Sequence, residues 1–327
     1  MDNKGLFTLL RKQSNDTLEL AAMLGFLVLC LAAFSAIAPG FLSAGTFRSM
    51  AFQLPELGLL TLAMFIPIIS GGLNLAVTYS ANICGLAAAF LVKGLLMSAG
   101  WASLPIALCV GVGVGAVIGV MVGAMVAYVG AHPILVTLGA MIFLRGLGEL
   151  LTRGGDISGM PEAFNFVGHG SLFGIPMPML IFLIAAGIVL YIMQYTKDGF
   201  SIYMSGSNPE AAKYTGINVN RTLMLVYGLS GAISGLAGIL MLARFNSVRI
   251  GHGDSYLLIT VLACFLAGAN PFGGFGRVLP LVVGLMSLQV VASGMNLLGA
   301  SQHLSTAIWG GFLLLVMILR SPFLKKN

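Results

Sequence analysis

Charged residues are scarce in this sequence of 327 residues. They make up 8% of the chain, whereas hydrophobic residues make up 58%. Soluble domains carry roughly 25% charged residues, so this composition excludes an ordinary soluble domain. The mean hydropathy of +1.00 predicts an integral membrane protein in contact with lipid. The formal net charge of +6 therefore bears on membrane orientation, and we expect no nucleic-acid partner.

The sequence also lacks the common motifs of catalysis and cofactor binding. Its four cysteines stand inside apolar runs without Cys-x-x-Cys spacing, which indicates neither a disulfide framework nor a metal site. No Gly-x-x-x-x-Gly-Lys-Ser/Thr, His-Glu-x-x-His or Gly-x-Ser-x-Gly motif occurs. We therefore expect a chain that is not an enzyme, with no catalytic residue, no metal and no bound cofactor.

Glycine, in contrast, is abundant and regularly spaced. "GVGVGA" at residues 111–116 loosely matches a dinucleotide-binding motif, but it lies in mid-membrane and follows no predicted strand. Glycines at 111, 115, 119 and 123 form a small-xxx-small stripe that favours close helix packing. Gly231 and Gly235 predict a second contact of this kind.

Charge-free intervals divide the chain into about ten predicted membrane helices, because a helix needs roughly 20 apolar residues to cross the hydrocarbon. The predicted spans are residues 20–47, 50–70, 75–97, 103–129, 132–152, 177–195, 221–243, 255–269, 273–295 and 304–320. The expected fold class is an all-α polytopic membrane protein whose residues 1–327 form a single transmembrane domain. The N-terminal segment resembles a signal peptide, but its apolar run is too long, so we interpret it as a retained span.

Basic residues predict the orientation of the spans. Threading the spans with both termini on one side places ten of them on that side: Lys4, Arg11, Lys12, Lys197, Lys213, Arg221, Arg277, Arg320, Lys325 and Lys326. Arg48, Arg153, Arg244 and Arg249 fall on the other side. The excess predicts that both termini are cytoplasmic. The longest predicted cytoplasmic loop is then the polar segment "GSNPEAAKYTGINV", residues 206–219.

Residues 206–219 have the features of a short capped helix. Asn208 is a suitable N-cap, Pro209 suits the first turn, and Glu210 complements the positive helix end. Ala211 and Ala212 offer a small, flat surface for a partner, and Gly216 suits a left-handed helix end. Without further motifs, a surface helix that only connects two spans is the favoured interpretation.

Four motifs in register resemble one family. They are "TLAMFIPIISGGLNLAVTYSANICG" (61–85), "HPILVTLGAMIFLRGLGELLTRGGDISGMPEAF" (132–164), the 206–219 segment and "GANPFGGFGRVLP" (268–280). Together they resemble bacterial ATP-binding-cassette (ABC) importer permeases for ribose, xylose, galactose and other simple sugars, within the branched-chain amino acid and monosaccharide permease family.

The resemblance implies a multi-pass permease subunit of the bacterial inner membrane that forms the path for a monosaccharide or related polyol. Separate ATPase subunits would use ATP and Mg, and residues 206–219 would be the coupling helix that docks on them. A second permease, identical or not, and an extracytoplasmic substrate-binding protein would complete the importer. Residues 153–176 and 244–254 would be the extracytoplasmic loops that receive the binding protein. The alternatives are an ion-coupled secondary transporter of a small polar solute, or an ABC permease for nucleosides or branched-chain amino acids.

The sequence departs from the family pattern where relatives carry acidic residues. Asn74 stands in place of an Asp, and Leu257 and Ile259 stand in place of two further acids. This subunit therefore either handles a different ligand or pairs with a non-identical permease that retains the acids.

The broken stretch "SGGLN", residues 70–74, is the candidate translocation path. Gly71 and Gly72 interrupt an apolar run, and irregular backbone at membrane depth must be buried in protein or face a water-filled cavity. Asn74 and Thr78 would then offer neutral hydrogen-bonding groups to a sugar. A tight turn at the cytoplasmic surface is the alternative.

Few ionisable residues remain within the predicted spans. Arg145 and Glu149 are four residues apart and predict an ion pair on one helix face. Glu56 lies near the outer surface in the predicted spans, where it would snorkel to water, pair between helices, or bond to a passing hydroxyl group.

Overall fold

The computed structural model describes residues 3–324, with side chains at residues 20–97, 99–301 and 303–318. The helices are α1 (Asn3–Ile37), α2 (Ala44–Ile69), α3 (Val77–Leu91), α4 (Ser103–Ala124), α5 (Pro133–Thr152), α6 (Glu162–His169), α7 (Met177–Tyr195), α8 (Lys197–Ser207), α9 (Pro209–Tyr214), α10 (Val219–Phe245), α11 (Tyr256–Leu266), α12 (Val278–Leu297) and α13 (Gln302–Leu324). The strands are β1 (Ile157–Ser158), β2 (Ser171–Leu172), β3 (Ile175–Pro176) and β4 (Ser247–Val248). A π-helical turn, Val92–Leu96, extends α3, a 3-10 segment, Met97–Ala102, leads into α4, and a second π-helical turn, Met125–Val129, ends α4.

Eight of the helical stretches among the described residues are long and apolar enough to cross a membrane. Two shorter apolar helices, Tyr256–Leu266 and His303–Ile318, accompany them. The prediction of an all-α polytopic membrane protein is therefore confirmed.

Two predicted spans are wrong in extent. The span at 20–47 ends at Ile37, because Pro39 and the left-handed Gly40 (φ 79°) turn the chain before Ser43 caps α2. The span at 255–269 is only the 11 residues of α11, about 16 Å, which covers roughly half of the hydrocarbon core. α11 stops there because the left-handed Gly268 (φ 96°) directs the chain into a glycine-rich turn.

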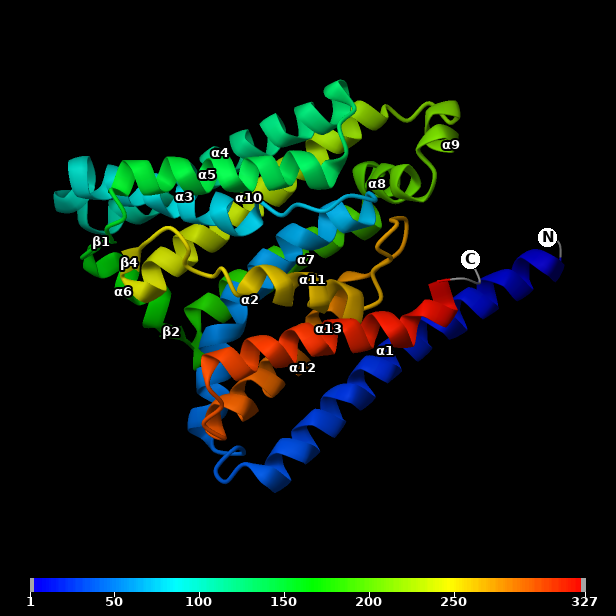
Figure 1. Cartoon of the computed structure of the whole chain (residues 1–327), viewed down its shortest axis with the longest axis horizontal. Coiled ribbons are helices and arrows are strands. Elements are labelled where there is room, and N and C mark those ends of the chain that lie inside the picture. The colour runs from blue at the N-terminus through cyan, green and yellow to red at the C-terminus, as the bar shows by residue number, and fades with distance from the viewer. Residues whose placement is uncertain (1–2, 325–327) are drawn as a thin grey trace.

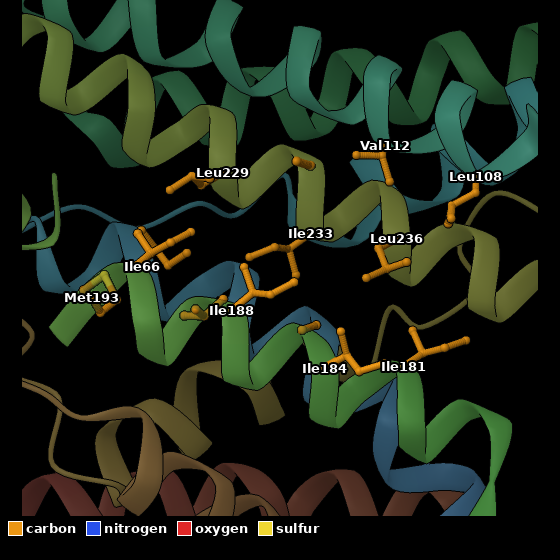
Figure 2. Close-up of a pocket in the computed structure, with 14 residues that line it drawn as sticks. Ile66, Leu108, Val112, Ile181, Ile184, Ile188, Met193, Leu229, Ile233 and Leu236 are labelled. Carbon is orange, nitrogen blue, oxygen red and sulfur yellow. The ribbon is translucent and has the colours of Figure 1, made fainter. Parts of the chain in front are cut away.

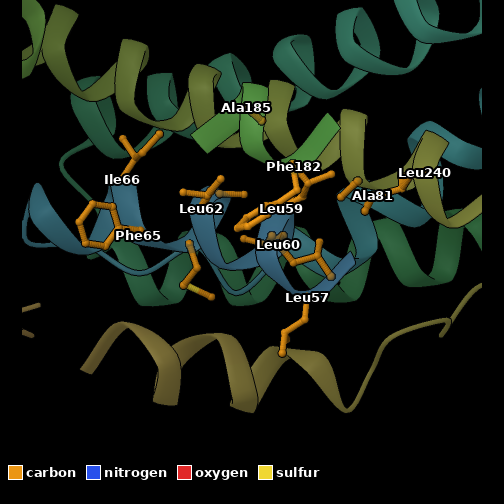
Figure 3. Close-up of a cluster of buried hydrophobic side chains, with 14 of the residues drawn as sticks. Leu57, Leu59, Leu60, Leu62, Phe65, Ile66, Ala81, Phe182, Ala185 and Leu240 are labelled. Atoms are coloured by element: carbon orange, nitrogen blue, oxygen red, sulfur yellow. The ribbon is translucent and has the colours of Figure 1, made fainter. Parts of the chain in front are cut away.

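The second helix forms the centre of the bundle. Every residue of α2 from Leu54 to Ile69 is buried, although the helix contains Pro55 and Pro67. Figure 3 shows its leucines and Phe65 packed between α7, α3 and α10 on one side and α11 on the other. The ring of Phe182 in α7 packs directly on Gly58, where a Cβ would come within 2.5 Å of the ring.

The glycine stripe of α4 packs against α10, as the spacing predicts. A Cβ on Gly115 would overlap the carbonyl oxygen of Gly231, and one on Gly235 would overlap that of Gly111. The expectation of two separate contacts is wrong, because the glycines of α10 face the glycines of α4 in one interface. Backbones that approach this closely leave no space for any side chain.

The ends of the bundle differ in what they carry. In Figure 1 the start of α1, the end of α13 and helices α8 and α9 lie at one end, which we call the α9 end. The strands β1 and β4 and helix α6 lie at the opposite end, which we call the β1 end. This arrangement agrees with termini and 206–219 on one side of the membrane, and the cytoplasmic orientation of that side stays a prediction. The side chains of Lys4, Arg11, Lys12 and Arg320, and Lys325 and Lys326 as a whole, lie outside the described residues.

Candidate functional site

The predicted coupling segment forms the short helix α9 at the α9 end of the molecule (Figure 1). Asn208 caps it, because its Oδ1 accepts a hydrogen bond from the Ala211 backbone N–H at 3.0 Å. Pro209 occupies the first position, and Gly216 adopts the left-handed conformation at φ 84°. The predicted capping is confirmed at both ends of the helix, whereas docking on an ATPase stays a prediction.

The exposed surface of α9 differs from the predicted one. Ala212 is fully buried against the protein, so the prediction that it faces a partner is wrong. Ala211, Glu210 and Lys213 are exposed, and the last two form an ion pair at 2.9 Å. Tyr214, which sequence reasoning missed, is 91% exposed and is the largest side chain presented by the helix. Its position three residues after Ala211 was the available signal, since residues three apart share a helix face.

Three of the glycine-containing motifs meet beside α9. A Cβ on Gly206 of α8 would overlap the carbonyl oxygen of Ile69, the last residue of α2. The Gly274 N–H donates to that same carbonyl at 2.8 Å, and Gly273 packs on Gly71 and Gly206. We call the contact of Gly71, Gly206, Gly273 and Gly274 the glycine junction. It joins the coupling segment to the end of α2 with backbone against backbone.

The chain leaves the glycine junction and re-enters the bundle as irregular backbone. The Asn74 Nδ2 donates to Ser230 Oγ at 2.9 Å, and Ser230 Oγ donates to the Ala63 carbonyl at 2.6 Å. Ala63 precedes Ile69 by six residues, so Asn74 lies about 9 Å inward from the end of α2. Gly71 is exposed in a left-handed turn, whereas Gly72 and Asn74 are buried, so the assignment of this stretch to the translocation path stays a prediction.

Asn74 and the Leu73 carbonyl are hydrogen-bonded within the bundle. Asn74 is 3% and Thr78 2% exposed, and the Leu73 carbonyl accepts from Thr137 Oγ1 at 3.1 Å. The hydroxyl group of the buried Tyr227 lies 2.5 Å from where a Cβ on Gly72 would stand. Whether a solute touches Asn74 or Thr78 stays a prediction.

A cavity of about 300 Å³ lies between α2, α11, α12 and α13, and sequence reasoning missed it. Its polar lining consists of amides, hydroxyl groups and two aromatic residues: Gln53, Ser255, Tyr256, Gln289, Asn296, Ser305, Thr306 and Trp309. Among the described residues, the lining contains no charged side chain. Ile259, where the resemblance has an acid, is part of the apolar wall. The cavity therefore suits a small neutral molecule with several hydroxyl groups.

Two glutamines of the cavity lining are hydrogen-bonded to each other. The Gln289 Nε2 in α12 donates to Gln53 Oε1 in α2 at 3.2 Å, and Gln53 Nε2 donates to Ser49 Oγ at 2.9 Å. Gln289 is 5% exposed, so its amide has few alternative partners. A hydroxyl group of a solute in the cavity would replace one glutamine as the hydrogen-bond partner of the other, because neither amide is left unpaired in this structure.

Glu56 lies one turn from Gln53 and is fully buried, so the expectation that it snorkels to water is wrong. Its Oε2 lies 3.0 Å from an Arg244 nitrogen and accepts a hydrogen bond from Tyr256 Oη at 3.4 Å. α10 and α11 supply these two partners, so Glu56 pairs between helices. Arg244 belongs to the last turn of α10, and its side chain is 18% exposed. It is therefore not one of the exposed charged residues of the predicted loop at 244–254.

The predicted ion pair between Arg145 and Glu149 is confirmed. Arg145 Nε lies 2.9 Å from Glu149 Oε1 on one face of α5. Both side chains are about half exposed, so the pair lies at the surface of the bundle, where Arg145 also stands 6.0 Å over the ring of Tyr79. A contact of this pair with solute stays a prediction.

The two loops at the β1 end form one surface. β1 pairs antiparallel with β4, so residues 153–176 and 244–254 are joined by hydrogen bonds. The Asn246 Oδ1 accepts from the Met160 N–H at 2.8 Å, and Arg249 lies 3.9 Å from Asp156. The pKa of His252 is lowered by burial and by Arg249, although Asp156 opposes the shift. His252 is therefore expected to be neutral near pH 7.

Comparisons with known proteins agree with the motifs. A family model described as branched-chain amino acid transport system / permease component matches residues 46–319. The autoinducer 2 import system permease protein LsrD of Salmonella typhi is 30% identical over 316 residues, which covers 95% of this chain and 92% of that protein. The LsrD proteins of Yersinia enterocolitica and Yersinia pseudotuberculosis are 29% and 30% identical over 280 residues, with 83% of this chain covered and 82% and 81% of theirs. No solved structure gives a significant match.

Proposed function

The chain belongs to the family of permease components of branched-chain amino acid transport systems, and we propose that within it the chain carries a monosaccharide or related polyol. As a member it is a multi-pass inner-membrane permease subunit of an ABC importer, in which a separate subunit hydrolyses ATP. The alternative prediction of an ion-coupled secondary transporter is therefore wrong.

The cavity between α2, α11, α12 and α13 carries this proposal. Its amides and hydroxyl groups can exchange hydrogen bonds with a polyol, and Trp309 and Tyr256 offer apolar faces with polar edges. A branched-chain amino acid bears two charges, and burying them without charged partners is unfavourable. The relatives named for autoinducer 2 import support a sugar-like solute.

We expect Gln289→Leu to reduce uptake of a neutral sugar. The substitution removes an amide that would form hydrogen bonds with the sugar in the cavity. Loss of each such hydrogen bond is expected to weaken sugar binding by roughly tenfold. Initial rates for radiolabelled ribose, xylose, galactose, valine and adenosine in cells that depend on this chain would identify the solute and its apparent KM.

Gln194→Leu in α7 is the matched control, because this glutamine is exposed and lies outside the cavity. An unchanged apparent KM in Gln289→Leu at normal membrane abundance would contradict the cavity as the solute path. Uptake of valine alone would contradict the proposal that the solute is a monosaccharide or polyol.

Coupling to ATP is proposed to run through α9 and the glycine junction. Movement of α9 and α8 by an ATPase would displace the end of α2, because Gly206 and Gly274 both contact Ile69. α2 also carries Gln53 and Glu56, so the displacement would reach the cavity and the Glu56–Arg244 pair. ATP and Mg would act only in the partner subunit.

We expect Tyr214→Ala to weaken ATPase binding. An exposed tyrosine at the centre of an interface often contributes about 2 kcal/mol, so retention of the ATPase on the purified permease would fall roughly thirtyfold. The measurement is the ATPase to permease ratio by quantitative mass spectrometry. Tyr191→Ala on α7, where the tyrosine is 62% exposed, is the control. Equal retention in both variants would contradict docking at α9.

The remaining partners are proposed from the same geometry. The joined surface at the β1 end would receive the substrate-binding protein, with charged side chains such as Arg249, Asp156 and Glu162 that set orientation and association rate. A second permease would complete the path. Because Asn74, Leu257 and Ile259 replace the acids of relatives, a non-identical partner that retains them is a specific alternative to a homodimer. Mass spectrometry of the purified complex distinguishes the two.

A further inference from the structure

An apolar groove of about 400 Å³ runs between α7 and α10, with α2 and α4 contributing to its walls (Figure 2). Aliphatic side chains and one methionine line it throughout: Ile66, Leu108, Val112, Ile181, Ile184, Ala185, Ile188, Val189, Ile192, Met193, Leu229, Ala232, Ile233 and Leu236. On α7 the lining extends from Ile181 to Met193, a length of about 18 Å. A polar solute has no hydrogen-bonding partner there, so the groove is separate from the proposed sugar path.

We propose that this groove binds one acyl chain of an anionic phospholipid. Ile184 and Ile188 are 63% and 54% exposed, so the groove opens on the lipid-facing side of the bundle. Its length is close to one leaflet of the hydrocarbon core, about 15 Å.

Positive charge at one end of the groove selects the headgroup. Gly199 of α8 packs on the carbonyl oxygens of Ile192 and Met193, which places the first turn of α8 against this end. Lys197 begins that turn and is exposed, and Arg221 is exposed in the first turn of α10, on which α8 also packs. Asp198 offsets one of these charges and leaves an excess of positive charge. This end is the predicted cytoplasmic one, where anionic lipid is concentrated.

Native mass spectrometry of the full chain tests the proposal. The chain is purified from nanodiscs of equal phosphatidylglycerol and phosphatidylcholine, and the lipid retained per chain is counted. We expect one tightly retained phosphatidylglycerol, preferred roughly tenfold over phosphatidylcholine. Ile188→Trp fills the groove and is expected to lose this lipid, and Lys197→Glu with Arg221→Glu to lose the headgroup preference.

Ile142→Trp on α5 is the matched control, because Ile142 is 62% exposed and lies outside the groove. Ala232→Leu fills the groove with a smaller change, so it replaces Ile188→Trp if that variant does not give a monodisperse protein. Equal retention in wild type and in the filled variants would overturn the proposal, as would equal retention of the two lipids. Loss of a second permease instead of lipid would show that the groove is a subunit interface.

Discussion

Gly115→Ala is expected to destabilise the bundle severely, although it adds a single methyl group. The new Cβ would overlap the carbonyl oxygen of Gly231 in α10, and both atoms belong to helices that are fixed by several further glycine contacts. Overpacking of this kind costs about 3 kcal/mol when the obstacle is backbone rather than a flexible side chain. A decrease in Tm of roughly 10 °C in detergent, or loss of the chain from the membrane, is the expected result.

The control for this prediction lies two residues away on the same helix. A Cβ on Gly113 would meet no neighbouring helix or side chain within 4 Å, and this glycine faces outward. Gly113→Ala is therefore expected to raise stability by up to about 1 kcal/mol, because alanine loses less backbone entropy in a helix. The two alanine substitutions thus have opposite expected signs. Equal Tm values for Gly115→Ala and Gly113→Ala would contradict the close α4 and α10 contact.

The sequence was sufficient for the fold class because span length and glycine spacing are local properties. Met177–Tyr195 coincides with its predicted span, and the stripe from Gly111 to Gly123 makes the close contact that its spacing indicates. α11 was predicted too long because hydropathy reports burial as readily as membrane crossing. Its residues are apolar because they pack on α2, and hydropathy does not separate this case from a true span.

The candidate site was only partly predictable. The cap of α9 is a contact between residues three apart, so Asn208 and Ala211 identify it from sequence alone. Gln53 and Gln289 are 236 positions apart, and no local pattern pairs them. The same holds for the glycine junction, where each motif contains its own glycines and only the fold shows that they touch. Glu56 could be singled out as an intramembrane acid, but its partner Arg244 was assigned to a loop.

Breaking the Glu56–Arg244 pair from its two sides is expected to give unequal results. Arg244→Met leaves a fully buried carboxylate that retains only the Tyr256 hydroxyl at 3.4 Å, whereas Glu56→Met leaves an arginine that is 18% exposed and can reach water. Removing one partner of a buried pair costs about 3–5 kcal/mol, and we expect Arg244→Met to fall in this range. Its Tm would then drop by roughly 10 °C, and that of Glu56→Met by less.

The double variant Glu56→Met/Arg244→Met separates a pairing effect from a packing effect. If the cost in Arg244→Met comes from the unpaired carboxylate, then removing that carboxylate restores most of the lost Tm, because replacement of both ions by apolar side chains is often neutral. The double-mutant cycle would show a coupling energy of about 2 kcal/mol or more. Additive losses would show that Arg244 acts through packing alone. Arg244 lies in the last turn of α10, shortly before β4. A favourable coupling energy would therefore mean that displacement of the joined surface at the β1 end is transmitted to α2 through the Glu56–Arg244 pair.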